Sequence, residues 1–196
     1  MPDPATQFWM NFLLNVAVAI GTIGAVVMAV FSDPIRIWFF RPKLRIAYEG
    51  PGSIVRTVDD HGNNLTYVRV AIWNDGNRNA KNVRVLVTDL TLQTVGKADI
   101  EFDSEVLELG FALSGGGPTD IPRGTYRLAD ICCLNRGVTA TLQFLFLKTP
   151  NYFPAGDLCE GRYKVTLKVT AENSGTETEI VQFEWNGKTE IRFIVA

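Results

Sequence analysis

The distribution of apolar and polar residues divides the chain into two parts. Residues 8–31 contain no charged side chain, and these 24 residues form about 36 Å of helix at ~1.5 Å per residue. That length crosses a hydrocarbon core of ~30 Å with some tilt. After residue 43 the apolar residues recur in short runs, often at every second position, with turn residues between the runs. The pattern predicts one transmembrane helix followed by a β-rich domain.

The clearest alternation in the second part lies at residues 67–73 and 81–87, where Val or Ile occupies every second position. The segment between them, 74–79, has the sequence Asn-Asp-Gly-Asn-Arg-Asn, which is rich in residues that tolerate positive φ angles. We therefore expect these two strands to form a hairpin, each with its Val and Ile side chains in the core.

The other apolar runs predict a similar architecture. Residues 52–65 are polar and are expected to form a loop, whereas 138–147 is the most apolar run and is expected to be a central strand. Further strands are expected at 43–49, within 121–131, and at 162–171, 179–185 and 190–195, with the last two joined by an Asn186-Gly187 turn. The total of about eight or nine strands predicts an all-β, immunoglobulin-like antiparallel β-sandwich after one transmembrane α-helix.

The predicted organisation has four segments. Pro34 is expected to end the helix, because a residue that precedes proline is disfavoured in the α conformation. The segments are a short extracytoplasmic N-terminus at 1–7, the transmembrane helix at 8–31, a basic and aromatic linker at 32–43, and the β-sandwich domain at 44–196.

The apolar segment is interpreted as an uncleaved membrane anchor rather than a secretory signal peptide. A signal peptide needs a basic start, a short apolar core and a cleavage site of small residues. Residues 1–7 contain no Lys or Arg, the apolar run is too long, and the sequence at 31–34, Phe-Ser-Asp-Pro, is a poor cleavage site.

Basic residues directly after the apolar segment predict its orientation. By the positive-inside rule they place the C-terminal domain in the cytoplasm, so we expect a single-pass protein of the cell inner membrane. The predicted membrane-interface anchors are Arg36, Trp38, Arg41, Lys43 and Arg45.

One face of the predicted helix carries polar and small side chains. Asn11, Asn15 and Thr22 fall within about 40° of one another on a helical wheel. The predicted helix-packing face consists of Asn11, Asn15, Gly21, Thr22, Ala25 and Ala29. Such faces favour homo-oligomers or docking on another membrane protein. The alternative is plain anchoring, because small residues are common in membrane helices.

The charge and the cysteine content of the chain argue against some kinds of partner and bound metal. The chain has 19 Lys+Arg and 21 Asp+Glu, and from Ile46 onward 15 basic residues stand against 19 acidic ones. This acidic balance, without a basic stripe, argues against nucleic acid as a partner. The spacing of Cys132, Cys133 and Cys159 fits neither a disulfide framework nor a zinc site, so buried reduced thiols are expected.

No motif predicts catalysis, a cofactor or a metal. His61 is the single histidine and lies in a polar segment, so we expect an exposed turn rather than a triad or a His-based metal site. The alternating acids at 99–105 would diverge along a strand, which favours a solvated sheet edge over a calcium site. The glycines at 115–117 lack the Lys-Ser/Thr of a phosphate-binding loop. The chain is expected not to be an enzyme.

Several stretches of the sequence resemble those of a known group of proteins. The run VRVAIWNDGNRNAKNVRV, the linker Phe40-Arg-Pro-Lys-Leu, the turn Asp120-Ile-Pro-Arg-Gly and the ending YKVTLKVTAENSG…FEWNG resemble bacterial single-pass membrane proteins with an N-terminal helix and an immunoglobulin-like β-sandwich domain. The resemblance implies this fold and supplies no catalytic residues.

These observations predict a membrane-anchored cytoplasmic β-sandwich that acts as a binding module and self-associates through its transmembrane helix. The alternative is a ligand-sensing effector, of the kind found in bacterial defence, whose helix oligomerises and perturbs the membrane. The expected partners are the lipid bilayer and a second membrane helix, from another copy of the chain or from another membrane protein. A small ligand is possible, and the sequence does not identify it.

Overall fold

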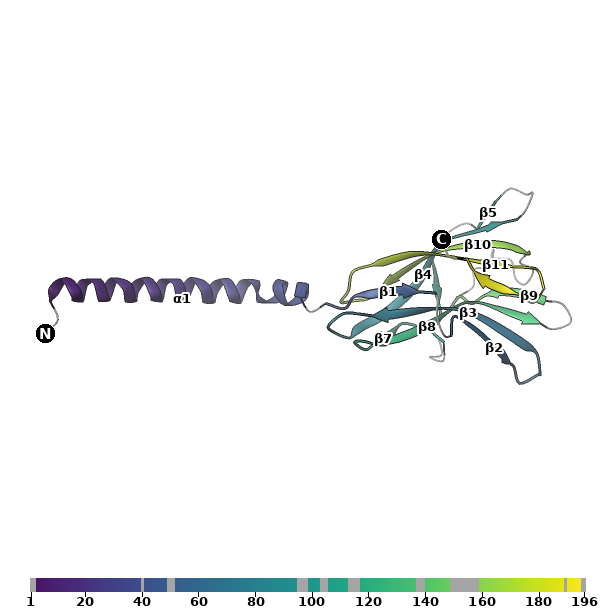
Figure 1. Cartoon of the computed structure of the whole chain (residues 1–196), viewed down its shortest axis with the longest axis horizontal. Coiled ribbons are helices and arrows are strands. Elements are labelled where there is room, and N and C mark those ends of the chain that lie inside the picture. Colours follow the sequence, from purple (N-terminus) through teal and green to yellow (C-terminus); the bar gives the residue numbers. More distant parts are fainter. Residues whose placement is uncertain are drawn as a thin grey trace. The chain divides into compact units, whose positions relative to one another are not determined.

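The computed structural model describes most of the chain, and of residues 32–39 it describes the backbone alone. The described residues are 3–39, 41–48, 52–94, 99–102, 106–112, 117–136, 140–148, 159–188 and 190–194. The chain forms two compact units, Met1–Arg41 and Pro42–Ala196. The first unit is the helix α1, Pro4–Phe39, and the second is built of strands (Figure 1).

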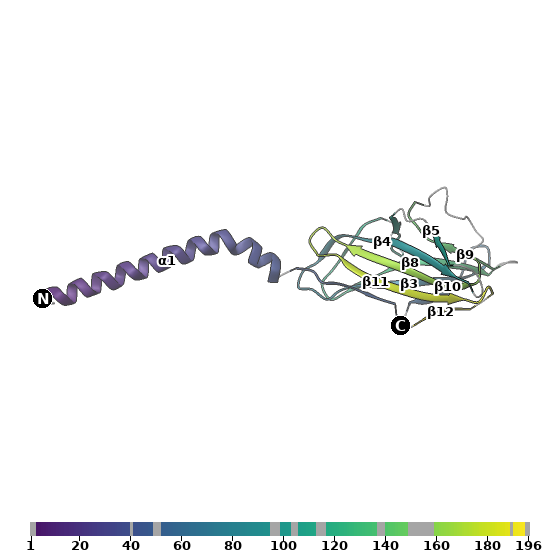
Figure 2. The ribbon, with the colours of Figure 1, turned by 90° about the horizontal axis from the view of Figure 1, so that it is seen from above.

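The helix does not end at Pro34, so that prediction was wrong. α1 continues to Phe39, and the last turns of its ribbon bend away from the axis of the earlier turns (Figure 2). Proline removes one backbone donor and crowds the preceding turn, and a helix accommodates both by bending. The preference of a pre-proline residue for extended conformations is therefore a tendency that a long helix overrides.

The second unit contains two antiparallel sheets, which confirms the all-β class. The first sheet comprises β1 (Leu44–Ala47), β2 (Ile54–Val58), β3 (Asn64–Asn74), β8 (Tyr126–Arg136) and β9 (Ala140–Phe144). The second comprises β4 (Ala80–Gln93), β5 (Ile100–Phe102), β6 (Leu107–Leu109), β7 (Thr119–Ile121), β10 (Gly161–Thr170), β11 (Glu177–Trp185) and β12 (Ile191–Phe193). The described residues thus form twelve strands, more than the eight or nine expected.

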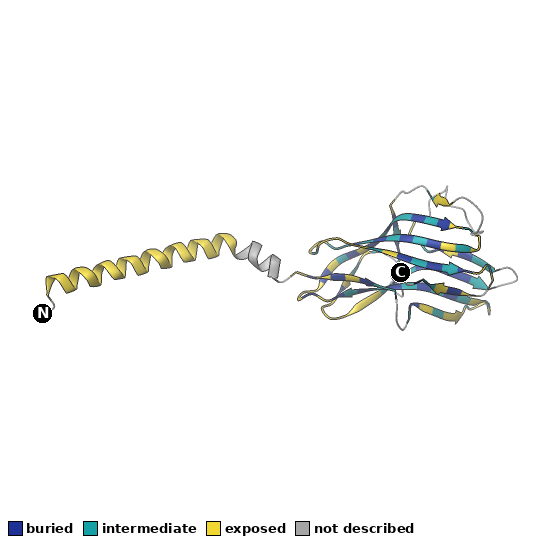
Figure 3. Ribbon diagram, turned by 45° about the horizontal axis from the view of Figure 1, so that its top comes forward, coloured by how far each residue is buried: buried dark blue, intermediate teal, exposed yellow. Residues whose placement is uncertain are grey.

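The inner faces of both sheets contribute to one hydrophobic core. Buried residues alternate with partly exposed ones along the long strands β3 and β10 (Figure 3). The predicted inward positions are confirmed at 68, 70 and 72 of β3, at 83, 85 and 87 of β4, and at 163, 165, 167 and 169 of β10, all of which are buried. Rings join the sheets: Phe144 of β9 lies 5.9 Å from Tyr163 and 6.3 Å from Phe183 between centroids.

The predicted hairpin of β3 and β4 does not form. β3 pairs with β1, β2 and β8 in the first sheet, while β4 pairs with β5, β6, β7 and β10 in the second. The segment 75–79 therefore carries the chain from one sheet to the other. The alternation of apolar and polar residues correctly predicted which side chains of the two strands face the core. It could not predict which sheet β4 joins, because β4 can bury the same side chains in the core from either of the two sheets.

The predictions for two further segments, 138–147 and 52–65, were also wrong. The run expected as a central strand forms β9, which ends the sheet order β1-β3-β8-β9. Beyond Phe144 the chain crosses to the second sheet, where Phe146 forms a bridge with Leu109. Its apolar residues fill the space between the sheets. The segment 52–65, expected as a loop, contains β2, which pairs with the first half of β3.

Two local predictions agree with the structure. β11 and β12 form an antiparallel pair around Asn186 and Gly187, and Gly187 has a φ of 72°. His61 is exposed in the turn before β3. Of the acidic row, Asp99 and Glu101 are exposed beside or in β5, which ends its sheet path. Asp103, Glu105 and the glycines at 115 and 116 lie outside the described residues.

Candidate functional site

The first candidate site is the surface of α1. Every described side chain of the helix through Phe31 is exposed, including Phe8, Trp9, Leu14 and Ile20. The segment Pro4–Phe31, 28 residues, is long and apolar enough to cross a membrane. Apolar side chains exposed along such a length are unstable in water, because monomeric soluble proteins rarely leave large contiguous apolar surfaces uncovered.

The predicted packing face lies on this exposed helix. Thr22 donates its hydroxyl to the carbonyl of Val18 at 2.8 Å, so its hydrogen bond is satisfied within the helix. No hydrogen bond joins the side-chain amide of Asn11 or Asn15 to another described residue. A Cβ added at Gly21 would meet no atom within 4 Å. The face is therefore open to a second helix, with two amides that need partners in hydrocarbon.

The predicted interface anchors fall in both units. The side chains of Arg36 and Trp38 lie outside the described residues, while Arg41 and Lys43 are exposed. Arg45 belongs to β1, where its Nε donates to the Asp75 carboxylate at 2.7 Å. This anchor is thus already paired inside the β-domain.

A second candidate site is the end of the β-domain where the chain enters it, which we call the entry end. It comprises Pro42–Arg45 and the loops 75–79, 122–125 and 171–176. The N–H of Asp75 donates to the carbonyl of Lys43 at 2.9 Å, and the Ser174 hydroxyl donates to the carbonyl of Pro42 at 3.1 Å. Two loops therefore hold the first residues of the domain.

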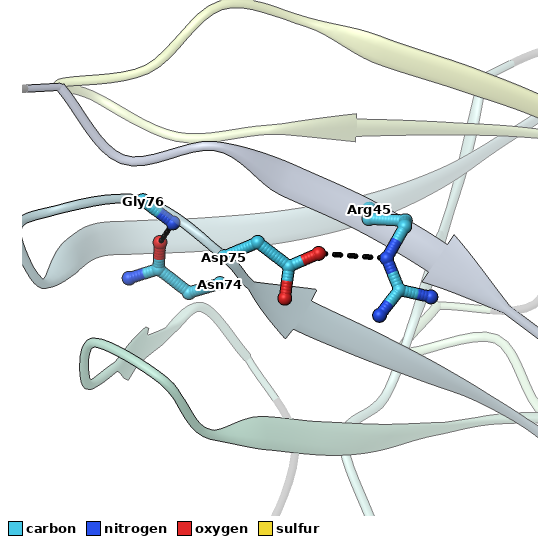
Figure 4. A network of polar contacts seen from close by, with 4 residues as sticks. All are labelled: Arg45, Asn74, Asp75 and Gly76. Carbon is cyan, nitrogen blue, oxygen red and sulfur yellow. Dashed lines mark hydrogen bonds and ion pairs between the residues drawn. The ribbon is translucent and has the colours of Figure 1, made fainter.

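The centre of the entry end is the buried side chain of Asn74. Its Nδ2 donates to the carbonyls of Arg78 and Ile121, at 2.7 and 3.0 Å. Figure 4 shows its oxygen accepting the N–H of Gly76 while Asp75 points to Arg45. An added Cβ at Gly76 would come within 2.3 Å of the Lys43 nitrogen, so only glycine fits at this close approach.

More asparagines connect the surrounding loops. Asn79 accepts the N–H of Arg123 at 3.1 Å, and its carbonyl accepts the amide of Asn173 at 3.0 Å. Asn82, with a φ of 51°, donates its backbone N–H to Asp120 and its side-chain amide to Glu172. The segment 74–79, expected from the sequence to be a hairpin turn, is thus one of several loops that side-chain hydrogen bonds join at the entry end.

A third cluster lies on the outer face of the first sheet. Arg69 Nε donates to the Asp130 carboxylate, and their side chains are only 14% and 17% exposed. The Arg69 guanidinium also lies 4.8 Å from the ring centroid of Tyr67. Burial raises the pKa of Asp130 although the bond to Arg69 lowers it. Burial likewise raises the pKa of the neighbouring Cys133 thiol, while its hydrogen bond with Tyr67 lowers it.

This cluster was not predicted from the sequence. Arg69 and Asp130 are 61 residues apart and meet only because β3 pairs with β8 in one register. In the sequence each of the two residues is only a charged residue at an outward position of a strand. Many exposed residues share that pattern, so it does not identify the pair.

The three cysteines divide by position. Cys132 and Cys133 are buried and Cys159 is exposed, and all three are free thiols. Burial raises the pKa of Cys132 well above its usual range, which keeps this thiol protonated and unreactive. The expectation of buried thiols is confirmed for two cysteines and wrong for Cys159. Among the described residues, no group of three or more His, Cys, Asp or Glu side chains is placed to hold a metal ion.

Comparisons with known proteins add little. No family model matches the chain, and no curated protein matches it. One similar solved structure is described as "X-ray structure of Northeast Structural Genomics Consortium target SoR45". It is 10% identical, and the likeness covers 82% of this chain and 98% of that chain with a TM-score of 0.32. A TM-score this low supports no conclusion about fold or function.

Proposed function

We propose that the protein is a membrane-anchored binding module. In this proposal α1 crosses the cell inner membrane once, and the β-domain, an immunoglobulin-like sandwich, binds its partner in the cytoplasm. The observation that carries the proposal is the fully exposed apolar surface of Pro4–Phe31. Keeping this apolar surface in water has a large free-energy cost, whereas the hydrocarbon core of a membrane covers it. The backbone N–H and C=O groups within the helix are already hydrogen-bonded to one another, so they need no partner from the lipid.

The cytoplasmic orientation is supported by charge and by thiol chemistry. The sequence between residues 36 and 45 holds four basic residues and no acidic one, whereas residues 1–7 hold Asp3 and no basic residue. Basic residues are retained on the cytoplasmic side of a membrane helix. Three free thiols also suit a reducing compartment better than an oxidising one.

Self-association through α1 is supported by the polar face. The side-chain amides of Asn11 and Asn15 have no hydrogen-bond partner among the described residues. In a membrane, an amide gains about 0.6–2 kcal/mol from a hydrogen bond across helices. A second copy of α1 supplies the same amides at the same depth, so a homo-oligomer satisfies both without another protein.

The orientation can be tested with Cys159, the exposed thiol. A membrane-impermeant maleimide is added to intact spheroplasts of an expressing bacterium and, separately, to lysed ones. We expect labelling of Cys159 only after lysis. A matched control, Asp3→Cys in a Cys159→Ser background, is expected to label in intact spheroplasts. The reverse labelling pattern would place the domain outside the cytoplasm.

The self-association can be tested by substitution within the helix. We expect Asn11→Leu with Asn15→Leu to shift the detergent-solubilised protein from oligomer to monomer in mass measurements. The matched control, Leu13→Ile with Ile20→Leu, changes the opposite face and should leave the oligomer intact. An oligomer that survives the asparagine substitutions contradicts association through this face.

A further inference from the structure

The outer faces of the two sheets differ in their side chains. On the second sheet the outward positions are rich in charges of both signs: Arg84, Asp89, Glu101, Glu108, Arg162, Lys164, Lys168, Glu184 and Arg192. A face of this composition is typical of a sheet in contact with water. On the first sheet the register turns mainly apolar and aromatic residues outward: Ala47, Val55, Leu65, Tyr67, Ala71, Trp73, Tyr126 and Leu128. All of them are partly or fully exposed, and a continuous apolar surface of this kind indicates an interaction site.

The outer face of the first sheet carries no net charge. Among the described residues of its five strands, the charged residues at outward positions are Arg45, Arg69 and Asp130. Arg69 is bonded to Asp130, and Arg45 is bonded to Asp75 at 2.7 Å. Each charge is therefore neutralised, although the chain from Ile46 onward has 19 acidic against 15 basic residues.

Three aromatic rings on this face are held in place by their neighbours. The Arg69 guanidinium lies 4.8 Å from the ring centroid of Tyr67, and the Arg45 guanidinium lies 5.7 Å from that of Trp73. The rings of Trp73 and Tyr126 are in contact, with centroids 4.5 Å apart. Side chains that are already ordered lose little freedom on binding. Trp, Tyr and Arg are also the residue types that contribute most to protein interfaces.

The face is large enough for a stable interface. The strands β1, β2, β3, β8 and β9 contain 4, 5, 11, 11 and 5 residues. With a rise of ~3.3 Å per residue and a strand spacing of ~4.8 Å, they cover about 570 Å². Two copies that pack these faces together bury about 1,100 Å², which meets the ~1,000 Å² expected of a biological interface.

We propose that the outer face of the first sheet is an interface between two copies of the β-domain. A second copy is favoured as the occupant because an acidic domain repels its own copies except where a surface has no net charge. In a two-fold contact the same ordered rings of both copies pack together. The strength of the contact rests on the self-association of the proposed function, since chains joined through α1 hold their β-domains at a high local concentration.

The test measures the protection of an added thiol on this face of the full chain. Thr57→Cys, at an exposed outward position of β2, is made in a Cys159→Ser background and labelled with a maleimide in detergent. From dilute to concentrated protein we expect the labelling rate to fall about tenfold, because mass action favours the dimer that covers the thiol. The control is Thr178→Cys, at an exposed outward position of β11 in the second sheet. It should react at one rate throughout.

A carboxylate within the contact should prevent it. Ala71→Glu and, separately, Val55→Glu place the same negative charge on both copies, so each should restore fast labelling of Thr57→Cys at every protein concentration. The matched control is Thr166→Glu, at an outward position of β10, which should leave the protection unchanged. Circular dichroism of each variant shows whether it is folded, and two variants at separate positions guard against the failure of one.

Two outcomes overturn the proposal. Fast labelling of Thr57→Cys at every concentration does so, and it is the result expected if the face binds a different protein. Protection that survives both Ala71→Glu and Val55→Glu also does so, because an association elsewhere then covers the thiol.

The helix variant Asn11→Leu with Asn15→Leu distinguishes this interface from the association through α1. In this variant we expect protection of Thr57→Cys only at higher protein concentration, and Ala71→Glu should still abolish it. A concentration dependence equal to that of the unsubstituted helix would contradict association through α1 while supporting the sheet interface.

Discussion

Gly76 donates its backbone N–H to the side-chain oxygen of Asn74 across 3.1 Å. The same side chain donates to the carbonyls of Arg78 and Ile121, so one buried amide connects β3, the crossing loop and β7. A buried backbone or side-chain polar group without a partner is costly. This bond therefore helps determine where the chain leaves the first sheet and enters the second.

Replacing Asn74 should destabilise the β-domain more than replacing its exposed neighbours. Asn74→Ala removes three hydrogen bonds and leaves buried groups unpaired, for an expected loss of about 3 kcal/mol in the free energy of unfolding. Urea unfolding of the full chain in detergent, followed by circular dichroism, measures the loss. The exposed Asn77 is the control, and Asn77→Ala should change stability by less than about 0.5 kcal/mol. Equal effects would contradict a structural role for the Asn74 amide.

Gly76 is expected to tolerate no side chain. A Cβ there would lie 2.3 Å from the Lys43 nitrogen and 2.5 Å from the Pro42 Cα, and these backbone atoms cannot move without breaking the entry end. Gly76→Ala should therefore cost about 2–4 kcal/mol or prevent folding. Gly175→Ala, in a loop of the same end with no atom within 4 Å of the new Cβ, should be nearly neutral. A stable Gly76→Ala protein would contradict the close approach.

The inward faces of the strands could be predicted from sequence because burial repeats every second residue. Val68 and Val83 were assigned to the core correctly for this reason. Their sheets could not be predicted, since the period of two is identical whether β4 returns beside β3 or opposite it. The choice depends on tertiary contacts such as those of Asn74, whose burial the composition of the 74–79 segment did not reveal.

The candidate sites divide in the same way. The apolar helix surface and its asparagines are local features, so the sequence was sufficient to find them. The Arg69–Asp130 pair and the Trp73–Tyr126 pair both depend on the register of β3 with β8. Pairings between distant strands follow from the whole fold and leave no spacing signal in the chain.

The thiols should differ in reactivity. With Cys159 exposed and Cys132 and Cys133 buried, the folded protein should react with Ellman's reagent at one thiol per chain within minutes. Burial raises the pKa of both interior thiols, which lowers their thiolate fraction as well as their access. Cys159→Ser should abolish the fast reaction, and denaturant should expose the two remaining thiols. Fast reaction of the Cys159→Ser protein would contradict the burial of the interior pair.

The ion pair on the outer face of the first sheet should couple its two residues strongly. The side chains of Arg69 and Asp130 are mostly buried, so removing Arg69 leaves the Asp130 carboxylate poorly solvated and without its partner, at a cost of about 3 kcal/mol. Arg69→Met with Asp130→Leu removes both charges and should recover much of that loss. A double-mutant cycle in urea unfolding measures the coupling. Additive single and double effects would show that the pair contributes nothing beyond its separate residues. The exposed pair of Arg192 and Glu184 provides the comparison, with an expected coupling below about 1 kcal/mol.

The same carboxyl should give the domain a characteristic pH dependence. In the folded state burial raises the pKa of Asp130 above its ordinary value of 3.8, so between the ordinary and the raised pKa the folded protein binds a proton that the unfolded chain does not. Stability then falls as pH rises through that window, and the loss stays constant at higher pH. Asp130→Asn cannot titrate. The difference in unfolding free energy between wild type and Asp130→Asn should therefore shift in favour of wild type as pH is lowered from 7 towards 4.

Urea unfolding of both proteins at intervals across this range measures the shift. Asp60→Asn, in the exposed turn before β3, serves as a matched control for a change of net charge. A difference between wild type and Asp130→Asn that is constant with pH, or that shifts towards the variant on acidification, would mean that Arg69 outweighs burial at Asp130. The carboxylate would then stabilise the outer face of the first sheet at neutral pH instead of lowering its stability.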